Sequence, residues 1–216
     1  MNAVIAGATG LIGSFLVDQM KTDKDVMTVT ALTRRSGEQV GKVAWTKVDF
    51  DQSADLEKAC GGADSAFCCL GTTMKNAGSK EAFRKVDHDY VIAFAKAAKS
   101  QGIETFSVVS AIGSDPDSSI FYNQVKGEME RDLKKIGFEI LNIFQPSILL
   151  GTREEGRLGE KIGTVAMKVA SPLMIGSLSK YKPIHVKTVA GAMLKLAKSP
   201  EKGVRHLEYE EMKTIF

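Results

Sequence analysis

Short apolar runs alternate with amphipathic stretches along most of this chain, and this alternation constrains the fold more than any other feature. The apolar runs predict strands near 3–8, 29–33, 42–48, 65–71, 105–111 and 138–144. The amphipathic stretches predict helices near 11–20, 53–60, 79–99 and 118–136. Strands that alternate with helices form a parallel sheet through right-handed crossovers. We therefore expect an α/β fold with a doubly wound parallel sheet and helices on both faces.

The length of the chain suits one domain. With 216 residues, 44% of them apolar and 25% charged, the chain has the composition of an ordinary globular protein. We interpret residues 1–216 as a single domain, in which 145–216 contribute the substrate-side loops and the last helix. The stretch "TVAGAMLKLAKSP", residues 188–200, predicts that helix, and "RHLEY", residues 205–209, predicts a final edge strand.

Charge and hydropathy exclude two classes of partner. The net charge is only +3, and the lysines are spread along the chain without a dense basic block, so we expect no nucleic-acid partner. The longest apolar segment of the C-terminal third, residues 165–176, is interrupted by Lys168 and Pro172 and is too short to span a bilayer. We therefore expect no membrane partner.

The cysteines and histidines do not form a metal-binding pattern. Cys60, Cys68 and Cys69 are odd in number and lack metal-ligand spacing, so they are expected to be reduced core residues. None of the three histidines, His88, His185 and His206, has a partner at a suitable spacing, so we interpret them as structural and predict no metal site. Because no signal-peptide pattern precedes the first apolar run, the expected location is the cytoplasm.

The segment "GATGLIG", residues 7–13, follows the first predicted strand directly and opens the first helix. Its three glycines permit a tight turn, a close approach of the backbone to a pyrophosphate, and close packing of the helix on the strand. Backbone amides at the helix start supply an anion site. A sharp turn without a ligand would use the same glycines, but this position favours a Rossmann-type dinucleotide site. The predicted contacts are Gly7, Thr9, Gly10, Leu11, Ile12 and Gly13.

The second predicted strand ends in "ALTRR". A domain that binds NAD usually has an acidic side chain at this point, against the ribose 2'-hydroxyl. Arg34 and Arg35 stand there instead, and a guanidinium matches a 2'-phosphate in charge and geometry. We therefore predict NADP(H) as the cofactor. The alternative is that both arginines are simply solvated.

Three residues form a candidate catalytic triad. Ser110 ends the strand at 105–111, twelve positions before Tyr122, and Lys126 follows one helical turn later. Tyr122 can pass its phenolic proton to a carbonyl oxygen as a hydride arrives. Lys126 is expected to lower the pKa of the phenol and to bind the nicotinamide ribose, and Ser110 would donate a hydrogen bond to the same oxygen. A tyrosine and a lysine also often form the polar edge of an amphipathic helix, but the serine and the glycine loop favour catalysis.

The glycine loop and the Y-x-x-x-K pair resemble the extended and atypical branches of the short-chain dehydrogenase/reductase superfamily. The stretches "CCLGTTMKNAGSKEAFRKVDHDYV", "SSIFYNQVKGEME" and "QPSILLGTREEGRLGE" are similar to its small TIP30/CC3 group, related to the HIV-Tat-interactive oxidoreductase. This resemblance implies a Rossmann fold that binds NADPH, and it places Asp49 against the adenine. Near the expected nicotinamide it places Leu70, Gly71 and Thr72.

The chain departs from the family pattern in one respect. Many relatives have a catalytic asparagine on the helix after the fourth strand, and the segment at 81–100 contains none. Asp87, His88 and Asp89 occupy part of it. One interpretation is that they position water or a neighbouring loop, but we favour a solvated, charged turn of helix. The loop at 151–160 would be a substrate lid or a partner-facing surface. Its Arg153 and Arg157 would bind an acidic substrate or form part of an alternating surface charge.

Three functions are compatible with these features. The first is an NADP(H)-dependent oxidoreductase that reduces a carbonyl of a small molecule through Ser110, Tyr122 and Lys126. The second is an NADPH-binding redox sensor that acts through a protein partner without turnover. The third is an epimerase or dehydratase that holds NAD tightly, against which the two arginines argue. A homodimer or a complex with another protein is compatible with each of the three.

Overall fold

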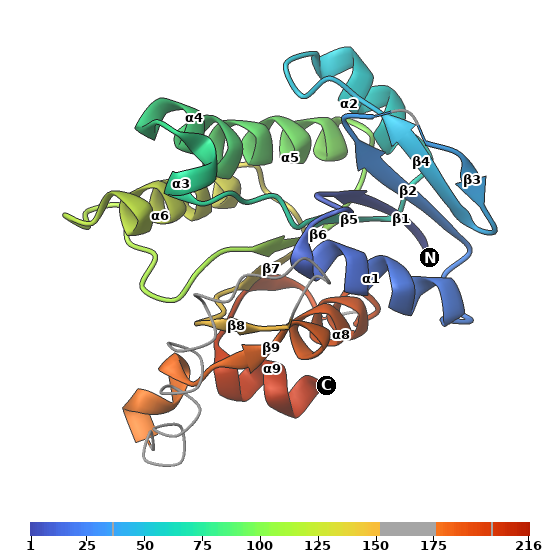
Figure 1. The fold of residues 1–216 in the computed structure, drawn as a ribbon. Helices are drawn as coiled ribbons and strands as arrows, with labels where there is room; N and C mark the ends of the chain where they lie inside the picture. The colour runs from blue at the N-terminus through green and yellow to red at the C-terminus, as the bar shows by residue number, and fades with distance from the viewer. Residues whose placement is uncertain (36, 152–175, 200) are drawn as a thin grey trace.

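The computed structural model describes residues 1–35, 37–151, 176–199 and 201–216, and one large sheet organises them (Figure 1). Within these residues the sheet has eight strands in the order β10-β7-β6-β5-β1-β2-β4-β3, and only β3 is antiparallel to its neighbour. The strands are β1 (Asn2–Ala6), β2 (Thr28–Thr33), β3 (Gln39–Val40), β4 (Val43–Lys47), β5 (Ser65–Cys68), β6 (Thr105–Val109), β7 (Ile140–Phe144) and β10 (Gly203–Leu207). The predicted doubly wound, Rossmann-like sheet is confirmed.

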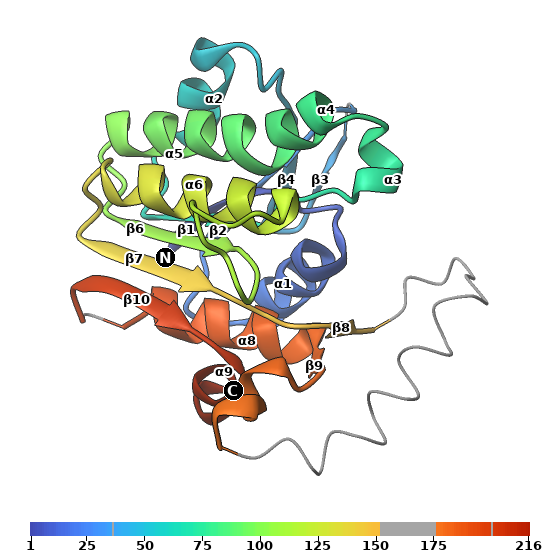
Figure 2. The same ribbon diagram turned by 90° about the vertical axis from the view of Figure 1, so that its left-hand side faces the viewer.

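Helices cover both faces of the sheet (Figures 1 and 2). One face packs against α1 (Leu11–Thr22), α8 (Val186–Ala197) and α9 (Tyr209–Ile215). The opposite face packs against α2 (Ser53–Cys60), α5 (Tyr90–Ser100) and α6 (Phe121–Lys134). Because both faces are covered, every residue of β5 and β7 is buried, which explains why these strands are apolar with little alternation.

The helix predicted at 79–99 is not continuous. It consists of α4 (Lys80–Arg84), a π-helical turn η1 (Lys85–Asp89) and α5, and the short helix α3 (Met74–Ala77) precedes it. The π turn accommodates one extra residue per turn, which apolar periodicity does not reveal. Helix α3, helix α9 and the two-residue strand β3 were not predicted, because they are too short to show a repeat in the sequence.

The C-terminal part adds a small parallel sheet beside the large one. Strand β8 (Leu149–Leu150) pairs with β9 (Ile184–His185), and the 3-10 helix η3 (Gly176–Tyr181) precedes β9. The final strand begins at Gly203, two residues earlier than expected, and runs parallel to β7. The predictions for residues 152–160, including Arg153 and Arg157, lie outside the described residues. Among the described helices, none is long and apolar enough to cross a bilayer.

The strand order reverses between β1 and β5. The chain leaving β1 returns to the sheet at β2, and the chain leaving β5 returns at β6, on the other side of the pair. The loops at the carboxyl ends of β1 and β5 therefore diverge and leave a crevice between them. The loop after β1 carries the glycines of residues 7–13, and the loop after β5 carries residues 69–73. The topology therefore places these two predicted ligand-binding segments side by side.

Phe106 is the aromatic centre of the core beneath α5 and α6. It is fully buried, stacks on Phe138 at 4.8 Å between ring centroids, and contacts Phe94 at 5.7 Å. We expect Phe106→Ala to lower the free energy of unfolding by about 3 to 5 kcal/mol, because it leaves a large cavity. Urea unfolding measures the loss. Met27→Ala, at a 66% exposed position, is the control, and equal small losses in both variants would contradict this assignment of the core.

Candidate active site

A cavity of about 600 Å³ opens at the carboxyl edge of the sheet, at the crevice between β1 and β5. It brings together the start of α1, the exits of β5 and β6, helix α6 and the segment that leads into β8. Of the residues predicted from the sequence, those that line it are Gly10, Leu11, Ile12, Leu70, Gly71, Thr72, Ser110, Tyr122 and Lys126. The structure thus brings the candidate triad and most of the predicted cofactor contacts to one place.

The turn after β1 requires glycine at its first position. Gly7 has φ +78°, and a Cβ atom there would lie 2.4 Å from the carbonyl oxygen of Cys69. The amide of Gly10 donates to the carbonyl of Gly7 at 2.8 Å and closes the turn. A Cβ at Gly13 would lie 2.2 Å from the same carbonyl oxygen. The tight turn and the close helix approach predicted from the glycines are both present.

The start of α1 fits an anionic group. Gly10 is the residue before the helix and has no side chain that could cap the first amides, and the first turn contains no acidic residue. Leu11 and Ile12 line the cavity, so the first turn of the helix borders the space where a pyrophosphate would lie. Thr9 is exposed on the preceding loop. These residues suit the diphosphate of a dinucleotide.

The residues predicted to bind the adenosine end lie outside the cavity lining. Arg34 and Arg35 are exposed just after β2, and no carboxylate of the described residues forms an ion pair with either. Asp49 is exposed after β4, and its carboxylate accepts a hydrogen bond from the amide of Asp51 at 3.0 Å. That bond closes a local turn, so the structure shows a local role for Asp49 in addition to the contact that the resemblance implies.

Lys126 is held by a carboxylate that we interpreted from the sequence as solvated. The Nζ atom of Lys126 lies 2.8 Å from Oδ1 of Asp87, and the two side chains are only 4% and 1% exposed. The other oxygen of Asp87 accepts a hydrogen bond from the amide of Thr72 at 2.8 Å. The interpretation of Asp87 as part of a solvated turn is therefore wrong. Asp87 connects the π turn, helix α6 and the loop after β5.

The sequence did contain a signal for the burial of Asp87. Phe83, Asp87 and Val91 are spaced four residues apart, and the two apolar members are fully buried. An aspartate in an apolar stripe faces the interior, where an ionised carboxylate requires a partner. Lys126, the fourth residue after Tyr122 on the facing helix, is that partner.

Tyr122 is less acidic than the sequence predicts. Burial raises the pKa of its phenol, Lys126 works in the opposite direction, and the charge of Asp87 raises the pKa further. Its ring packs on Phe83 at 5.6 Å between centroids. Lys126 lowers the pKa of the phenol as predicted, but burial and Asp87 outweigh the ammonium, so the net shift is upward. Tyr122 is a neutral phenol at neutral pH, which suits a proton donor.

The pKa of Lys126 is raised despite its burial. Burial alone works to lower it, but the charges of Asp87 and Tyr122 and the hydrogen bond to Asp87 together outweigh that effect. Lys126 is therefore an ammonium ion at neutral pH, within an ion pair whose charges offset each other.

Ser110 lies at the exit of β6 and is 4% exposed. Its amide donates to the carbonyl of Phe144 at 2.7 Å, which fixes the backbone at the cavity wall. Its hydroxyl contacts the carboxylate of Glu130 and the hydroxyl of Ser114. Glu130, also 4% exposed, was not singled out from the sequence. It follows Lys126 by four residues and Tyr122 by eight, and this regular spacing was the available signal.

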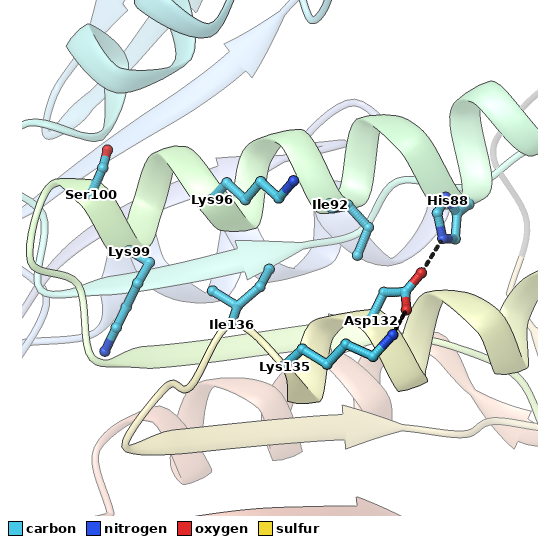
Figure 3. A pocket seen from close by; sticks show the side chains of 8 residues that line it. All are labelled: His88, Ile92, Lys96, Lys99, Ser100, Asp132, Lys135 and Ile136. Atoms are coloured by element: carbon cyan, nitrogen blue, oxygen red, sulfur yellow. Dashed lines mark hydrogen bonds and ion pairs between the residues drawn. The ribbon is translucent and has the colours of Figure 1, made fainter.

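A second hollow lies between α5 and α6, away from the candidate triad (Figure 3). Ile92 and Ile136 form its apolar part, and His88 bridges the helices by pairing with Asp132 at 3.1 Å between Nε2 and Oδ2. Hydrogen bonds from Lys135 and Arg131 hold the pKa of Asp132 well below its usual range. This arrangement agrees with the structural role predicted for His88.

The thiols show no chemistry of their own. Cys60, Cys68 and Cys69 are unpaired, and burial raises the pKa of Cys60 and of Cys68 to about 12. Across the part of the chain that the structure describes, no three histidine, cysteine or acidic side chains are grouped so that they could hold a metal ion.

The sheet order, the glycine turn and the uncapped start of α1 define an NAD(P)-binding protein of the Rossmann type. The family described as NAD(P)H-binding matches residues 7–162, and this chain belongs to that family. Binding of NAD(P)H is thereby established as a family property, whereas the choice between NAD(H) and NADP(H) is not.

Two relatives extend over nearly the whole chain. Protein HTATIP2 of Rattus norvegicus is 37% identical over 215 residues, which cover 98% of this chain and 86% of the relative. The mitochondrial protein FMP52 of Eremothecium gossypii is 35% identical over 218 residues, which cover 100% and 97%. HTATIP2 is also named TIP30, so the resemblance to the TIP30/CC3 group is confirmed.

The predicted cytoplasmic location is contradicted by these relatives. FMP52 proteins of Eremothecium gossypii and Candida albicans, 35% and 34% identical to this chain, are named as mitochondrial. The prediction relied on the absence of a signal-peptide pattern, which concerns secretion and does not exclude an organelle.

Solved structures share the fold at low identity. MoeE5 in complex with UDP-glucose and NAD has a TM-score of 0.71 at 16% identity, over 96% of this chain and 76% of that one. UDP-N-acetylglucosamine 4-epimerase from Bacillus cereus has a TM-score of 0.71 at 17% identity, over 100% and 80%. These likenesses support the architecture and leave the reaction open.

Asp87→Asn removes the carboxylate that offsets the charge of Lys126 beside Tyr122. We expect the pKa of Tyr122 to fall, because the ammonium then acts on the phenol without an opposing charge. Phenolate absorption against pH measures this, with the Tyr122 contribution obtained by subtracting the titration of Tyr122→Phe. Asp89→Asn, which alters an exposed carboxylate two residues away, is the matched control. An unchanged Tyr122 titration in Asp87→Asn would contradict the proposed coupling.

Proposed function

We propose that this protein is an NADP(H)-dependent oxidoreductase that reduces a carbonyl group of a small molecule. The observation that carries the proposal is the single cavity that joins the first turn of α1 to Ser110, Tyr122 and Lys126. When bound, the reduced nicotinamide supplies a hydride. Membership of the NAD(P)H-binding family supports the cofactor class, and Arg34 and Arg35 favour the phosphorylated form.

In this proposal the first turn of α1 binds the diphosphate, and the loop after β5 contacts the nicotinamide end. Asp87 fixes both Lys126 and the amide of Thr72, so the position of that loop is coupled to the position of the lysine. Lys126 retains its ammonium hydrogens, which can bind the hydroxyls of a ribose. The ion pair therefore aligns the dinucleotide with the residue that supplies the proton.

Tyr122 donates its phenolic proton to the substrate oxygen as the carbonyl carbon receives the hydride. Its raised pKa keeps the proton on the phenol at neutral pH, which favours the reductive direction. Ser110 lines the same cavity and would contact the substrate beside Tyr122. The remaining wall is largely apolar, with Ile112, Pro146 and Leu149, and it can exclude water from the reacting atoms.

Tyr122→Phe removes the proposed acid and leaves the ring in place. Against a panel of aldehydes and ketones, with NADPH consumption as the assay, we expect the turnover rate to fall about a hundredfold or more. NADPH binding is expected to persist, because the phenyl ring still fills its place against Phe83. Tyr181→Phe changes another tyrosine of the cavity and serves as the control. Full activity in Tyr122→Phe would show that the mechanism is wrong.

The double variant Arg34→Ala/Arg35→Ala tests the choice of cofactor. We expect NADPH affinity to fall about tenfold or more, because a charge-assisted contact to the 2'-phosphate is lost, with NADH affinity nearly unchanged. Fluorescence titration with each cofactor measures both affinities. Lys47→Ala, an exposed cation at the end of the neighbouring strand β4, is the control. An equal effect on the two cofactors would contradict selection for NADPH.

The second candidate is an NADPH-binding regulator that acts through a protein partner without turnover. One observation favours it: Lys126 and Ser110 each have an ionised or polar partner inside the protein, so neither side chain needs a substrate for a hydrogen bond. Partner binding that depends on NADPH and persists in Tyr122→Phe would support this candidate over the reductase.

A further inference from the structure

Glu130 is a buried carboxylate for which the proposed reaction has no role. The residue is 4% exposed, and Lys126, one turn earlier on α6, is paired with Asp87 instead. Two neighbours of Glu130, Gln145 and Ser110, donate hydrogen bonds to it. The side-chain amide of Gln145 lies 2.9 and 3.1 Å from its two oxygens, the hydroxyl of Ser110 contacts Oε1, and Nδ1 of His206 lies 3.6 Å from Oε2.

These contacts determine where the hydroxyl hydrogen of Ser110 points. One amide nitrogen of Gln145 donates toward both oxygens of Glu130, and the hydroxyl of Ser110 donates to Oε1, so the carboxyl oxygens act as acceptors in these contacts. Ser114 donates its own hydrogen to the carbonyl of Ala111 at 2.7 Å, so toward Ser110 it is also an acceptor. Both internal neighbours of the Ser110 hydroxyl therefore accept. A bond to a carboxylate is about twice as strong as one to a neutral oxygen, so the hydrogen goes to Glu130.

We propose that Glu130 is a positioning residue that takes the hydroxyl hydrogen of Ser110, so that the serine presents a lone pair to the cavity. This inference rests on the proposed function and changes the expected role of Ser110 from donor to acceptor. Tyr122 is then the donor to the carbonyl oxygen, and Ser110 pairs with a second group of the substrate that carries a hydrogen. The substrate class that fits is a carbonyl compound with a neighbouring hydroxyl group.

An NMR measurement that requires no turnover tests the first half of the proposal, the hydrogen bond from Ser110 to Glu130. The protein is labelled with 13C at the glutamate carboxyls, and the Glu130 signal is assigned by its loss in Glu130→Gln. We expect Ser110→Ala to shift this signal at neutral pH, because the carboxylate loses a donor, and Glu128→Gln on the same helix to leave it in place. An unmoved Glu130 signal in Ser110→Ala would overturn the proposal, whether or not the protein is a reductase.

A matched pair of ligands tests the second half. Binding of 2-hydroxycyclohexanone and of 2-methoxycyclohexanone, whose ether oxygen can only accept a hydrogen bond, is measured by NMR in the presence of NADP⁺, where neither can be reduced. We expect wild-type protein to favour the hydroxyketone about tenfold, the worth of one hydrogen bond. Glu130→Gln, whose amide can donate to Ser110 and turn its hydrogen toward the cavity, is expected to lose this preference, as is Ser110→Ala.

The outcomes separate the two proposals. Equal binding of both ketones by wild type and by Glu130→Gln would overturn the acceptor role of Ser110, even if reduction is observed. A hydroxyl preference that depends on Glu130 would support it, even if no ketone is reduced. If the protein reduces the hydroxyketone, Glu130→Gln is expected to raise KM for it and to leave kcat nearly unchanged. A general loss of structure would not change KM alone. Glu128→Gln is the control in each measurement.

Discussion

The ion pair between Lys126 and Asp87 is the interaction on which the arrangement of the site depends. Both groups are almost fully removed from water. An unpaired charge in such a buried position would cost several kcal/mol. The pair therefore forces helix α6, the π turn and the loop after β5 to maintain their positions together. Because Asp87 also binds the amide of Thr72, the cofactor side and the proton-donating side of the cavity share one anchor. Burial and the charge of Asp87 together keep Tyr122 protonated against the ammonium of Lys126.

The polar groups of the cavity are largely held in place before any ligand enters. Lys126 is fixed by Asp87, Ser110 by Glu130, and the backbone of the first loop by the turn at Gly7. Such preorganisation removes part of the cost of ordering side chains when a substrate binds. It also restricts the hydrogen bonds that each polar side chain can offer a ligand, because an internal partner already occupies one of its hydrogen-bonding positions.

The sequence allowed the sheet, its helical layers and the glycine turn after β1 to be predicted, because each has a periodic or local signature. Strand β7 is apolar apart from Asn142, and the glycines at 7–13 encode their turn within seven residues. Asp87 was misinterpreted and Glu130 was missed for a different reason, because their roles depend on long-range contacts. Asp87 pairs with Lys126, which follows it by 39 positions, and Glu130 contacts Ser110, which precedes it by 20. The pairing of Leu149 with Ile184 is also long-range and has no local pattern. The cellular compartment could not be inferred from fold physics at all.

The π turn at residues 85–89 makes the site sensitive to the number of residues in this segment as well as to their identity. A π turn can be understood as an α-helix with one residue inserted. Deletion of one residue before Asp87 would allow a regular helix to continue from α4 into α5, and the apolar stripe could still pack. Each residue of an α-helix turns by about 100°, however, so the carboxylate would rotate away from Lys126 while the core remained intact. A relative that lacks one residue in this segment would therefore fold well but lose the ion pair that holds its site together. Gaps at this position in an alignment of relatives should be interpreted as functional changes.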